Sequence, residues 1–211
     1  MDHRELRALS KRLSYVLRHD PASVGIDLDP HGWADTESLL AGLRAHGVPI
    51  DRALLDEVVA RNDKQRLAFD DDDDGDDGDD NADDGHRRIR ARQGHTVPVD
   101  LGLDARPPPA ALFHGTVPRA LAAIRRDGLL PRGRHHVHLS ADVATALAVG
   151  GRRGRPVVLR VDSAAMAAAG HAFFLTGNGV WLTDAVSPDF LSLLSDPPAG
   201  HDGRGWADRI D

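Results

Sequence analysis

Arginine and histidine are the residue types whose positions in this sequence first indicate chemistry. Arg18 and His19 stand together at the end of an amphipathic helical pattern, just before Pro21, which stops a helix. Because the helix dipole favours cations in the last turn, the pair has an ordinary structural explanation. The alternative is an anion clamp, in which the planar guanidinium of Arg18 and a pH-dependent donor on His19 bind phosphate oxygens.

A second group of polar residues, His114, Gly115 and Thr116, follows a short apolar segment and precedes a helical pattern that begins at Pro118. The glycine would let a ligand approach the backbone, while the histidine and threonine offer directional hydrogen bonds. A simple turn explains the same three residues.

A third group lies in the segment RHHVHLS, residues 134–140. The residues that would share one face of an extended strand are Arg134, His136, His138 and Ser140. Such a row of donors is unusual in a core strand. Histidines can bind a metal, but the motif contains no carboxylate ligand, so we expect a polar ligand and no metal.

The segment VGGRRGRPVVL, residues 149–159, places Arg152 and Arg153 in a glycine-rich loop between a helix and a buried strand. Surface arginines are the ordinary interpretation, yet such a loop also suits a phosphate held by backbone and guanidinium groups together. The chain has neither a strand-GxGxxG-helix pattern nor GxxxxGK[ST]. Neither a Rossmann nucleotide site nor a P-loop is therefore predicted.

The distribution of carboxylates narrows the chemistry further. Glutamate occurs only at Glu5, Glu37 and Glu57, so the second half of the chain has none. This argues against a transferase that uses a catalytic glutamate there to activate a side chain or water. A nucleophile that is already an anion, such as a phosphate, needs no such base and needs arginines to position it.

The net charge of -7 reflects one acidic segment, because eleven of the 33 acidic residues lie between Asp70 and Asp84. The remaining 22 acidic residues stand against 26 basic ones, a balance of about +4, so an anionic partner is not excluded.

The chain has no cysteine, which excludes disulfides and thiolate metal sites. It shows no membrane span or signal peptide, and we expect a cytoplasmic protein.

The predicted elements divide into two α+β parts. Helices are expected at residues 4–19, 36–46 (with Asp35 as N-cap) and 52–61, a short strand with a Pro/Gly turn within 25–33, and a hairpin from 64–69 and 86–94. Three helices and a hairpin are typical of a winged helix, by analogy of fold. We expect the acidic tip, 70–84, to be disordered rather than a calcium loop, because it lacks the ligand spacing of one.

The stiff proline-rich stretch 105–110 is the predicted boundary, and a flexible tail ends the chain. Between them we expect helices at 118–127 and 142–149, a short Ala-rich helix, and short strands at 111–115, 136–140, 156–161, 172–176 and 180–183. The expected domains are 1–104, 105–195 and the tail 196–211.

Taken together, several of these segments resemble the KptA-type family of RNA 2′-phosphotransferases, the tRNA 2′-phosphotransferases. They occur in family order from about Ser10 to Phe190: LSKRLSYVLRHDPASVGIDLDPHGW, NDKQRLAF, IRARQGHT, LFHGT, RHHVHLS, VGGRRGRPVVL and GNGVWLT. Two features depart from the family pattern. Leu67 stands where an aromatic residue is more usual, and the acidic insertion is long.

The resemblance implies a winged-helix RNA-binding lobe followed by an ADP-ribosyltransferase-like lobe that binds NAD, consumed as a co-substrate, without a metal. The family removes an internal 2′-phosphate from spliced RNA. The RNA phosphate attacks C1″ of the nicotinamide ribose and expels nicotinamide, and O2″ of the ADP-ribose then attacks the phosphorus. The products are RNA with a 2′-hydroxyl and ADP-ribose 1″,2″-cyclic phosphate. The implied partner is a tRNA-like RNA, no membrane is involved, and we expect a monomer.

The resemblance also assigns residues. Arg18, His19 and Arg66 would hold the splice-junction phosphate, and Arg152 would stabilise charge in the second step. The residues that would hold NAD are His114, Gly115, Thr116, Arg134, His136, His138 and Ser140. An acidic wing tip would repel RNA, so we expect it to point away from the RNA path.

Two other functions stay open at this point. One is an NAD-dependent enzyme that caps terminal RNA or DNA phosphates with ADP-ribose and stops after the first step. The other is a winged-helix nucleic-acid binder without catalysis.

Overall fold

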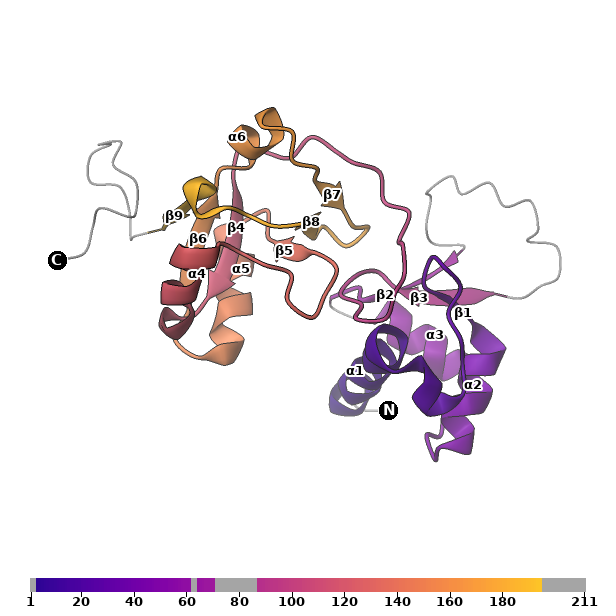
Figure 1. The fold of residues 1–211 in the computed structure, drawn as a ribbon. Coiled ribbons are helices and arrows are strands. Elements are labelled where there is room, and N and C mark those ends of the chain that lie inside the picture. Colours follow the sequence, from indigo (N-terminus) through magenta and orange to yellow (C-terminus); the bar gives the residue numbers. More distant parts are fainter. Residues whose placement is uncertain (1–2, 62–63, 71–86, 195–211) are drawn as a thin grey trace. The chain divides into compact units, whose positions relative to one another are not determined.

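The computed structural model describes residues 3–61, 64–70 and 87–194. The chain divides into two compact units, residues 1–102 and 103–211, and each is described by itself (Figure 1). The division falls just before the proline-rich stretch 105–110. Apart from Asp70, the predicted acidic wing tip lies outside the described residues, and so does the predicted tail 196–211.

Three α-helices form the first unit's helical part, as the apolar periodicity predicts. They are α1 (His3–His19), α2 (Thr36–Ala45) and α3 (Arg52–Ala60), with a 3₁₀ turn, η1 (Pro21–Val24), after α1. The predicted cap of α2 is confirmed, because the carboxylate of Asp35 accepts a hydrogen bond from the Ser38 amide (2.7 Å). Asp51 caps α3 in the same way through the Leu54 amide (2.8 Å).

The first unit also contains a small antiparallel sheet with strand order β1-β3-β2. Its strands are β1 (Trp33–Asp35), β2 (Leu67–Phe69) and β3 (Arg88–Ala91), so the predicted hairpin is confirmed. Within 25–33 the predicted strand is wrong except at Trp33, where β1 begins, whereas the predicted Pro/Gly turn is confirmed. Asp29 accepts hydrogen bonds from the amides of His31 and Trp33 (2.9 and 2.8 Å), which fold the segment into a turn.

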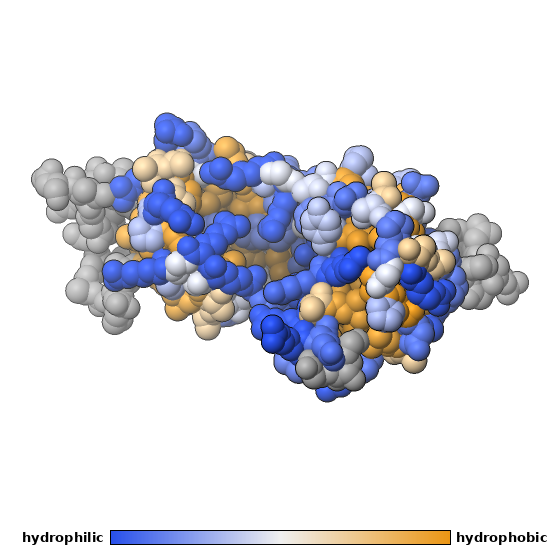
Figure 2. All heavy atoms as spheres, turned by 90° about the horizontal axis from the view of Figure 1, so that it is seen from below, coloured by the Kyte–Doolittle hydropathy of each residue, from blue (hydrophilic) through white to orange (hydrophobic). Residues whose placement is uncertain are grey.

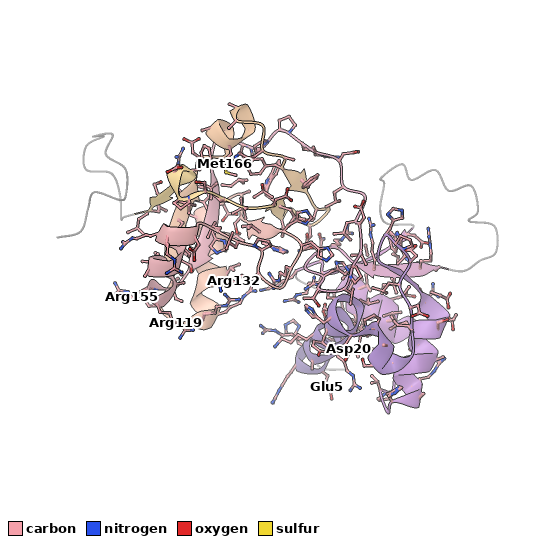
Figure 3. The ribbon with its side chains drawn as sticks, viewed as in Figure 1. Glu5, Asp20, Arg119, Arg132, Arg155 and Met166 are labelled. Carbon is pink, nitrogen blue, oxygen red and sulfur yellow. The ribbon has the colours of Figure 1, made fainter. Side chains whose placement is uncertain are left out.

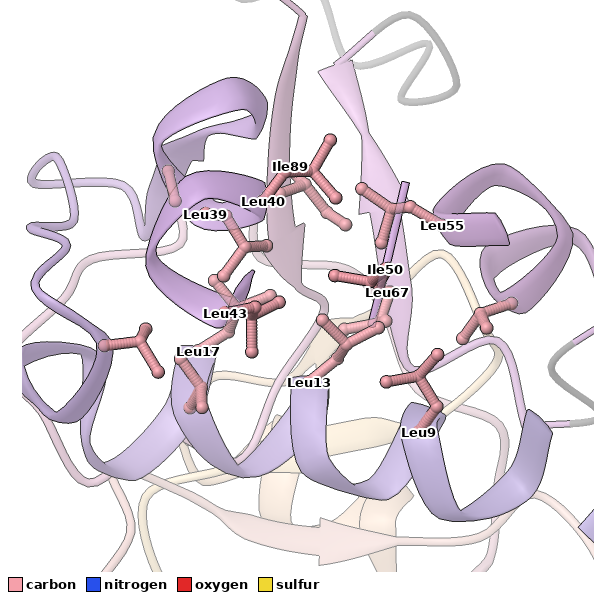
Figure 4. Packing of buried hydrophobic residues seen from close by; sticks show 14 of the residues in the cluster. Leu9, Leu13, Leu17, Leu39, Leu40, Leu43, Ile50, Leu55, Leu67 and Ile89 are labelled. Carbon is pink, nitrogen blue, oxygen red and sulfur yellow. The ribbon is translucent and has the colours of Figure 1, made fainter. Parts of the chain in front are cut away.

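Leucines from all three helices meet the sheet in one core (Figure 4). Leu13 and Leu17 of α1 are completely buried, as are Leu39, Leu43 and Leu55 of the other helices. Because the residues of α1 that face this core recur every three or four positions, the opposite face of α1 is left to solvent. Packing on this scale fixes the end of α1, and therefore the position of Arg18 and His19.

The second unit consists of two antiparallel sheets within the described residues. One has the order β4-β6-β9, from β4 (Leu112–Thr116), β6 (Val157–Val161) and β9 (Leu191–Leu193). The other has the order β5-β8-β7, from β5 (Val137–Leu139), β7 (Phe174–Leu175) and β8 (Trp181–Thr183). The sequence predicts all of these strands except β9. Helices alternating with short antiparallel strands confirm the α+β class.

The helices of the second unit lie between the strands in the chain (Figure 1). They are η3 (Pro118–Ala120), α4 (Leu121–Asp127), α5 (Val143–Gly150), η4 (Gly151–Arg153), α6 (Ser163–Ala168) and η5 (Pro188–Phe190). Met166 of α6, labelled in Figure 3, is completely buried in the core of this unit.

The surface in view in Figure 2 is hydrophilic over much of both units, with hydrophobic side chains visible between the polar ones. None of the helices in the described parts of the chain combines the length and apolar character that a membrane crossing needs.

Candidate functional site

In the first unit, the end of α1 is held by the segment that follows β3. The backbone amide of Thr96 donates to the carbonyl oxygen of Arg18 (2.9 Å), and the Val97 amide reaches the same oxygen (3.4 Å). These bonds satisfy a carbonyl that the helix end would otherwise leave without a partner. The backbone of Arg18 is thus fixed, and its half-buried side chain extends from a rigid position.

His19 is oriented by the same threonine. Its Nδ1 lies 3.0 Å from the Thr96 hydroxyl, which itself donates to the Arg18 carbonyl (3.4 Å). The hydroxyl has one proton, so it accepts from Nδ1–H of the imidazole. The hydrogen bond therefore places the proton of a neutral His19 on Nδ1. Donation from Nε2 to a phosphate oxygen then requires the imidazolium form.

Arg66 is attached to the other end of this segment. The Arg92 amide donates to the carbonyl oxygen of Arg66 (2.9 Å), so the segment 92–96 binds Arg66 at one end and Arg18 at the other. Gln93 and His95 within the segment are 7% and 2% exposed, which anchors it in the unit. Three cation-forming residues predicted from the sequence are thus brought to one loop.

In the second unit, the sequence-predicted polar residues lie where β4 meets β5. Phe113 and Ser140 exchange two backbone hydrogen bonds (2.9 and 2.8 Å), which join the two strands. Val137 and Leu139 are buried, whereas His136, His138 and Ser140 are half-buried on the other face. The predicted alternation of RHHVHLS is therefore confirmed for these three residues.

Arg134 is the exception to this alternation. It precedes the strand, in a turn where its amide donates to the Pro131 carbonyl (3.2 Å). Its position beside the strand therefore depends on the turn and not on the strand's alternation.

His114 makes the central contact of this region, because its Nδ1 lies 3.1 Å from the carbonyl oxygen of His138. A carbonyl can only accept, so Nδ1 carries the proton. Burial, opposed by this hydrogen bond and assisted by the charge of Arg153, lowers the pKa of His114 below its ordinary value. At neutral pH the imidazole is therefore uncharged, and Nε2 is an acceptor suited to a ligand hydroxyl.

The charge of Arg153 acts on both His114 and Arg134. The pKa of Arg134 is lowered, first by partial desolvation of its guanidinium group and then by the charge of Arg153. The side chain is largely exposed and stays cationic. Arg152 and Arg153 both belong to η4, directly after α5, and both are exposed. A bound anion would offset the repulsion between these cations, so the region is suited to bind one.

The remaining predicted residues take different positions. His136 Nε2 lies 3.7 Å from an Asp184 carboxylate oxygen, and its ring meets Phe174 edge-on at 5.5 Å. Thr116 is buried at the end of β4, opposite Val157. In the part of the chain that the structure describes, no group of three or more His, Cys, Asp or Glu side chains is placed to hold a metal ion.

A glycine is required at position 115 for a structural reason that the sequence does not reveal. A Cβ atom at this position would lie 1.8 Å from the carbonyl oxygen of Ala146, because α5 packs directly on β4. On the side where a Cβ would point, the space beside this glycine is filled by a helix.

Comparison with known proteins identifies the family of this chain. A family model described as RNA 2′-phosphotransferase, Tpt1 / KptA family, matches residues 3–185. The chain belongs to the Tpt1/KptA family of RNA 2′-phosphotransferases. The match includes every candidate residue of both units, from Arg18 to Arg152.

Relatives within this family are similar over nearly their whole length. A probable RNA 2′-phosphotransferase of Streptomyces griseus is 53% identical over 194 residues, which cover 92% of this chain and 99% of the relative. Those of Burkholderia lata and Hahella chejuensis are each 50% identical, covering 90% and 93% of this chain and 91% and 99% of the relatives. The family resemblance inferred from the motifs is therefore confirmed.

Replacing Gly115 by alanine should destabilise this RNA 2′-phosphotransferase by at least about 3 kcal/mol, since backbone must move to admit the methyl group. Urea unfolding measures the change. Gly133→Ala is the matched control, because a Cβ there meets nothing within 4 Å, and it should change stability by less than about 0.5 kcal/mol. Equal stability of the two variants would show that α5 does not press on β4 as described.

The pKa of His114 gives a second prediction, for stability against pH. Because this pKa is lowered in the folded protein, the unfolded chain binds more protons below its ordinary value near 6.5, and stability falls as the pH falls through that range. His114→Asn keeps a donor for the His138 carbonyl but cannot titrate. It should lose less unfolding free energy between pH 7 and pH 5 than the wild type.

Thermal unfolding across this pH range checks the His114 prediction. The exposed His135→Asn is its control and should retain the wild-type pH dependence. If His114→Asn also retains it, the neutral form of His114 does not contribute to stability.

Sequence reasoning missed two residues of the site. Thr96 lies in the quoted motif IRARQGHT, but only the structure shows that it binds both Arg18 and His19. Arg153 lies in the glycine-rich loop, where the sequence does not distinguish it from other surface arginines, yet its charge acts on His114 and Arg134. A family motif identifies such positions without saying which neighbour each contacts.

Proposed function

We propose that this family member is an NAD-dependent RNA 2′-phosphotransferase that transfers an internal RNA 2′-phosphate to ADP-ribose. The observation that carries the proposal is the loop 92–96, which holds Arg18, His19 and Arg66 together. An arginine fork and an imidazolium are donors suited to a dianionic phosphate monoester. The cytoplasm is the proposed location, and the proposed enzyme acts as a monomer.

The fold supports this assignment at two places. Helices α1–α3, followed by the β2–β3 hairpin with β1 as third strand, suit a winged-helix RNA lobe. The two antiparallel sheets of the second unit, joined at Phe113 and Ser140, suit an ADP-ribosyltransferase-like lobe that holds NAD outside any Rossmann motif.

The residues near His114 fit a dinucleotide. Neutral Nε2 of His114 would accept a hydrogen bond from a ribose hydroxyl, and Arg134 with Arg153 would face the diphosphate. We assign Thr116, His136, His138 and Ser140 to the same site, with Gly115 contributing through the packing of α5. No metal is needed, because arginines neutralise the phosphates.

The proposed reaction has two steps. A phosphate oxygen of the RNA forms a bond to C1″ of the nicotinamide ribose, and nicotinamide leaves with the electrons of the glycosidic bond. O2″ then attacks the phosphorus, and the bond from phosphorus to the RNA 2′-oxygen breaks. The proton that O2″ loses balances the one that the RNA 2′-oxygen gains. Arg152 would stabilise the charge that develops on the phosphoryl group in this second step.

An oligoribonucleotide with one internal 2′-phosphate, incubated with and without NAD, tests the proposal. We expect loss of the phosphate only with NAD, accompanied by nicotinamide, when the products are weighed by mass spectrometry. A strand that keeps the ADP-ribose would indicate a capping enzyme, and phosphate loss without NAD would indicate a phosphatase. No reaction would indicate a binder.

A further inference from the structure

One face of α1 carries cations along most of its length. The exposed residues Arg4, Arg7 and Lys11 follow one another at steps of three and four, and Arg18 lies two turns further along. At 100° per residue these positions fall within one stripe, opposite the leucines that enter the core. The stripe ends at the candidate phosphate site.

An exposed aromatic residue interrupts these cations. Tyr15 lies between Lys11 and Arg18 on the same stripe and is 56% exposed, which is unusual for a large ring. Its ring centre lies 5.5 Å from the His19 ring, with the planes tilted by 50°. Packing in the core therefore does not explain this tyrosine. We call Arg4, Arg7, Lys11 and Tyr15 the α1 ridge.

An amphipathic helix needs a polar outer face, but such a face ordinarily mixes charges of both signs. Here Glu5 is the one acidic residue among the seventeen of α1. It lies in the first turn, where the helix dipole favours a negative charge, and about 100° around the helix from Arg4, outside the stripe. Figure 3 labels Glu5 and also Asp20, which follows α1. The middle of the ridge therefore presents only positive charge.

We propose that the α1 ridge binds the RNA strand on one side of the 2′-phosphate. This inference rests on the proposed function, since it places that phosphate at Arg18 and His19. Cations spaced along a groove or ridge follow a nucleic-acid backbone, and an aromatic ring among them stacks on a base. From Arg4 to Arg18 the helix rises about 21 Å, at 1.5 Å per residue, which spans a few nucleotides.

The test compares a long oligoribonucleotide, extended on both sides of an internal 2′-phosphate, with a short one that has a single nucleotide on each side. The triple variant R4A/R7A/K11A keeps good helix formers on α1. For the long substrate its KM should rise at least about tenfold with unchanged kcat. The slope of log KM against log salt should fall by about 2, the value for three lost phosphate contacts to a single strand. The short substrate should be unaffected.

The triple variant R44A/R119A/R126A is the matched control, because it removes three exposed cations from elsewhere on the protein. It should show the wild-type KM on both substrates. Equal effects of the two triple variants on the long substrate would overturn the proposal, and so would an equal effect of R4A/R7A/K11A on both substrates.

Tyr15 provides an independent check on base stacking. Tyr15→Ala should raise the KM for the long substrate about tenfold, whereas Tyr15→Phe keeps the ring and should match the wild type. An unchanged KM in Tyr15→Ala would show that the Tyr15 ring does not stack on a base of the RNA.

Fluorescence anisotropy can measure how tightly the protein binds the same RNA without its 2′-phosphate. This experiment tests RNA binding by the α1 ridge independently of phosphate transfer. If the wild type shows no NAD-dependent turnover, the proposed function fails, and the ridge is then judged by binding alone. Weaker binding in R4A/R7A/K11A than in R44A/R119A/R126A supports it, and equal binding overturns it.

Discussion

Arg18→Ala is expected to abolish both steps of phosphate transfer, with the rate of RNA 2′-phosphate removal falling at least about 100-fold. The loop contacts at Thr96 hold the Arg18 backbone, so the guanidinium starts from a fixed position. A fork that makes two charge-assisted hydrogen bonds loses about 1.5 to 3 kcal/mol for each, and 1.4 kcal/mol is tenfold in rate. Neither free nicotinamide nor ADP-ribosylated RNA should form. Single-turnover assays with labelled RNA measure both.

Two variants control this result. Arg18→Lys keeps the charge but lacks the planar fork, so it should recover only part of the activity. Arg44→Ala removes an exposed arginine from α2 and should retain wild-type rates. If Arg18→Ala released nicotinamide at the wild-type rate, Arg18 would not hold the attacking phosphate.

Arg152→Ala should produce the second large effect, an accumulation of RNA that carries ADP-ribose on its 2′-phosphate. Arg152 lies in η4 at the surface of the second unit, and we assign it to the charge of the second step alone. The first step should therefore proceed while the second slows by roughly 100-fold, the cost of about 3 kcal/mol of lost transition-state stabilisation. Gel electrophoresis would show the heavier strand persisting.

Arg153→Ala distinguishes the two neighbouring arginines. Because the charge of Arg153 acts on His114 and Arg134, this variant should raise the KM for NAD and accumulate no intermediate. An equal loss of the first step in Arg152→Ala and Arg18→Ala would contradict the separate roles given to them.

The helices could be predicted from the sequence because their signals are local. Asp35 caps α2 as expected, and α1 ends at His19, as Pro21 predicts. The Pro/Gly turn within 25–33 is also local, and the Asp29 carboxylate stabilises it. The strand expected before this turn is wrong, because β1 begins only at Trp33 and pairs with β3, far away in the sequence. The short strand β9 pairs with β6, far away in the sequence, and carries no local signal of its own.

The same distinction between local signals and long-range contacts applies to the candidate site. Residue types and family order were sufficient to choose Arg18, His114 and His138, since each lies in a specific motif. Contacts between distant segments were not predictable. Thr96 reaches Arg18 across more than seventy residues, and only the folded chain places the Ala146 carbonyl against Gly115.

The central claim is that the RNA phosphate itself attacks NAD, so that its oxygen needs no carboxylate to deprotonate it. Tracing a labelled phosphorus tests this claim most directly. RNA with a ³²P-labelled internal 2′-phosphate is incubated with the enzyme and NAD, and the small products are separated. We predict that the label leaves the RNA in ADP-ribose 1″,2″-cyclic phosphate, in equal amount to nicotinamide. Label released as inorganic phosphate at the same rate without NAD would contradict the account.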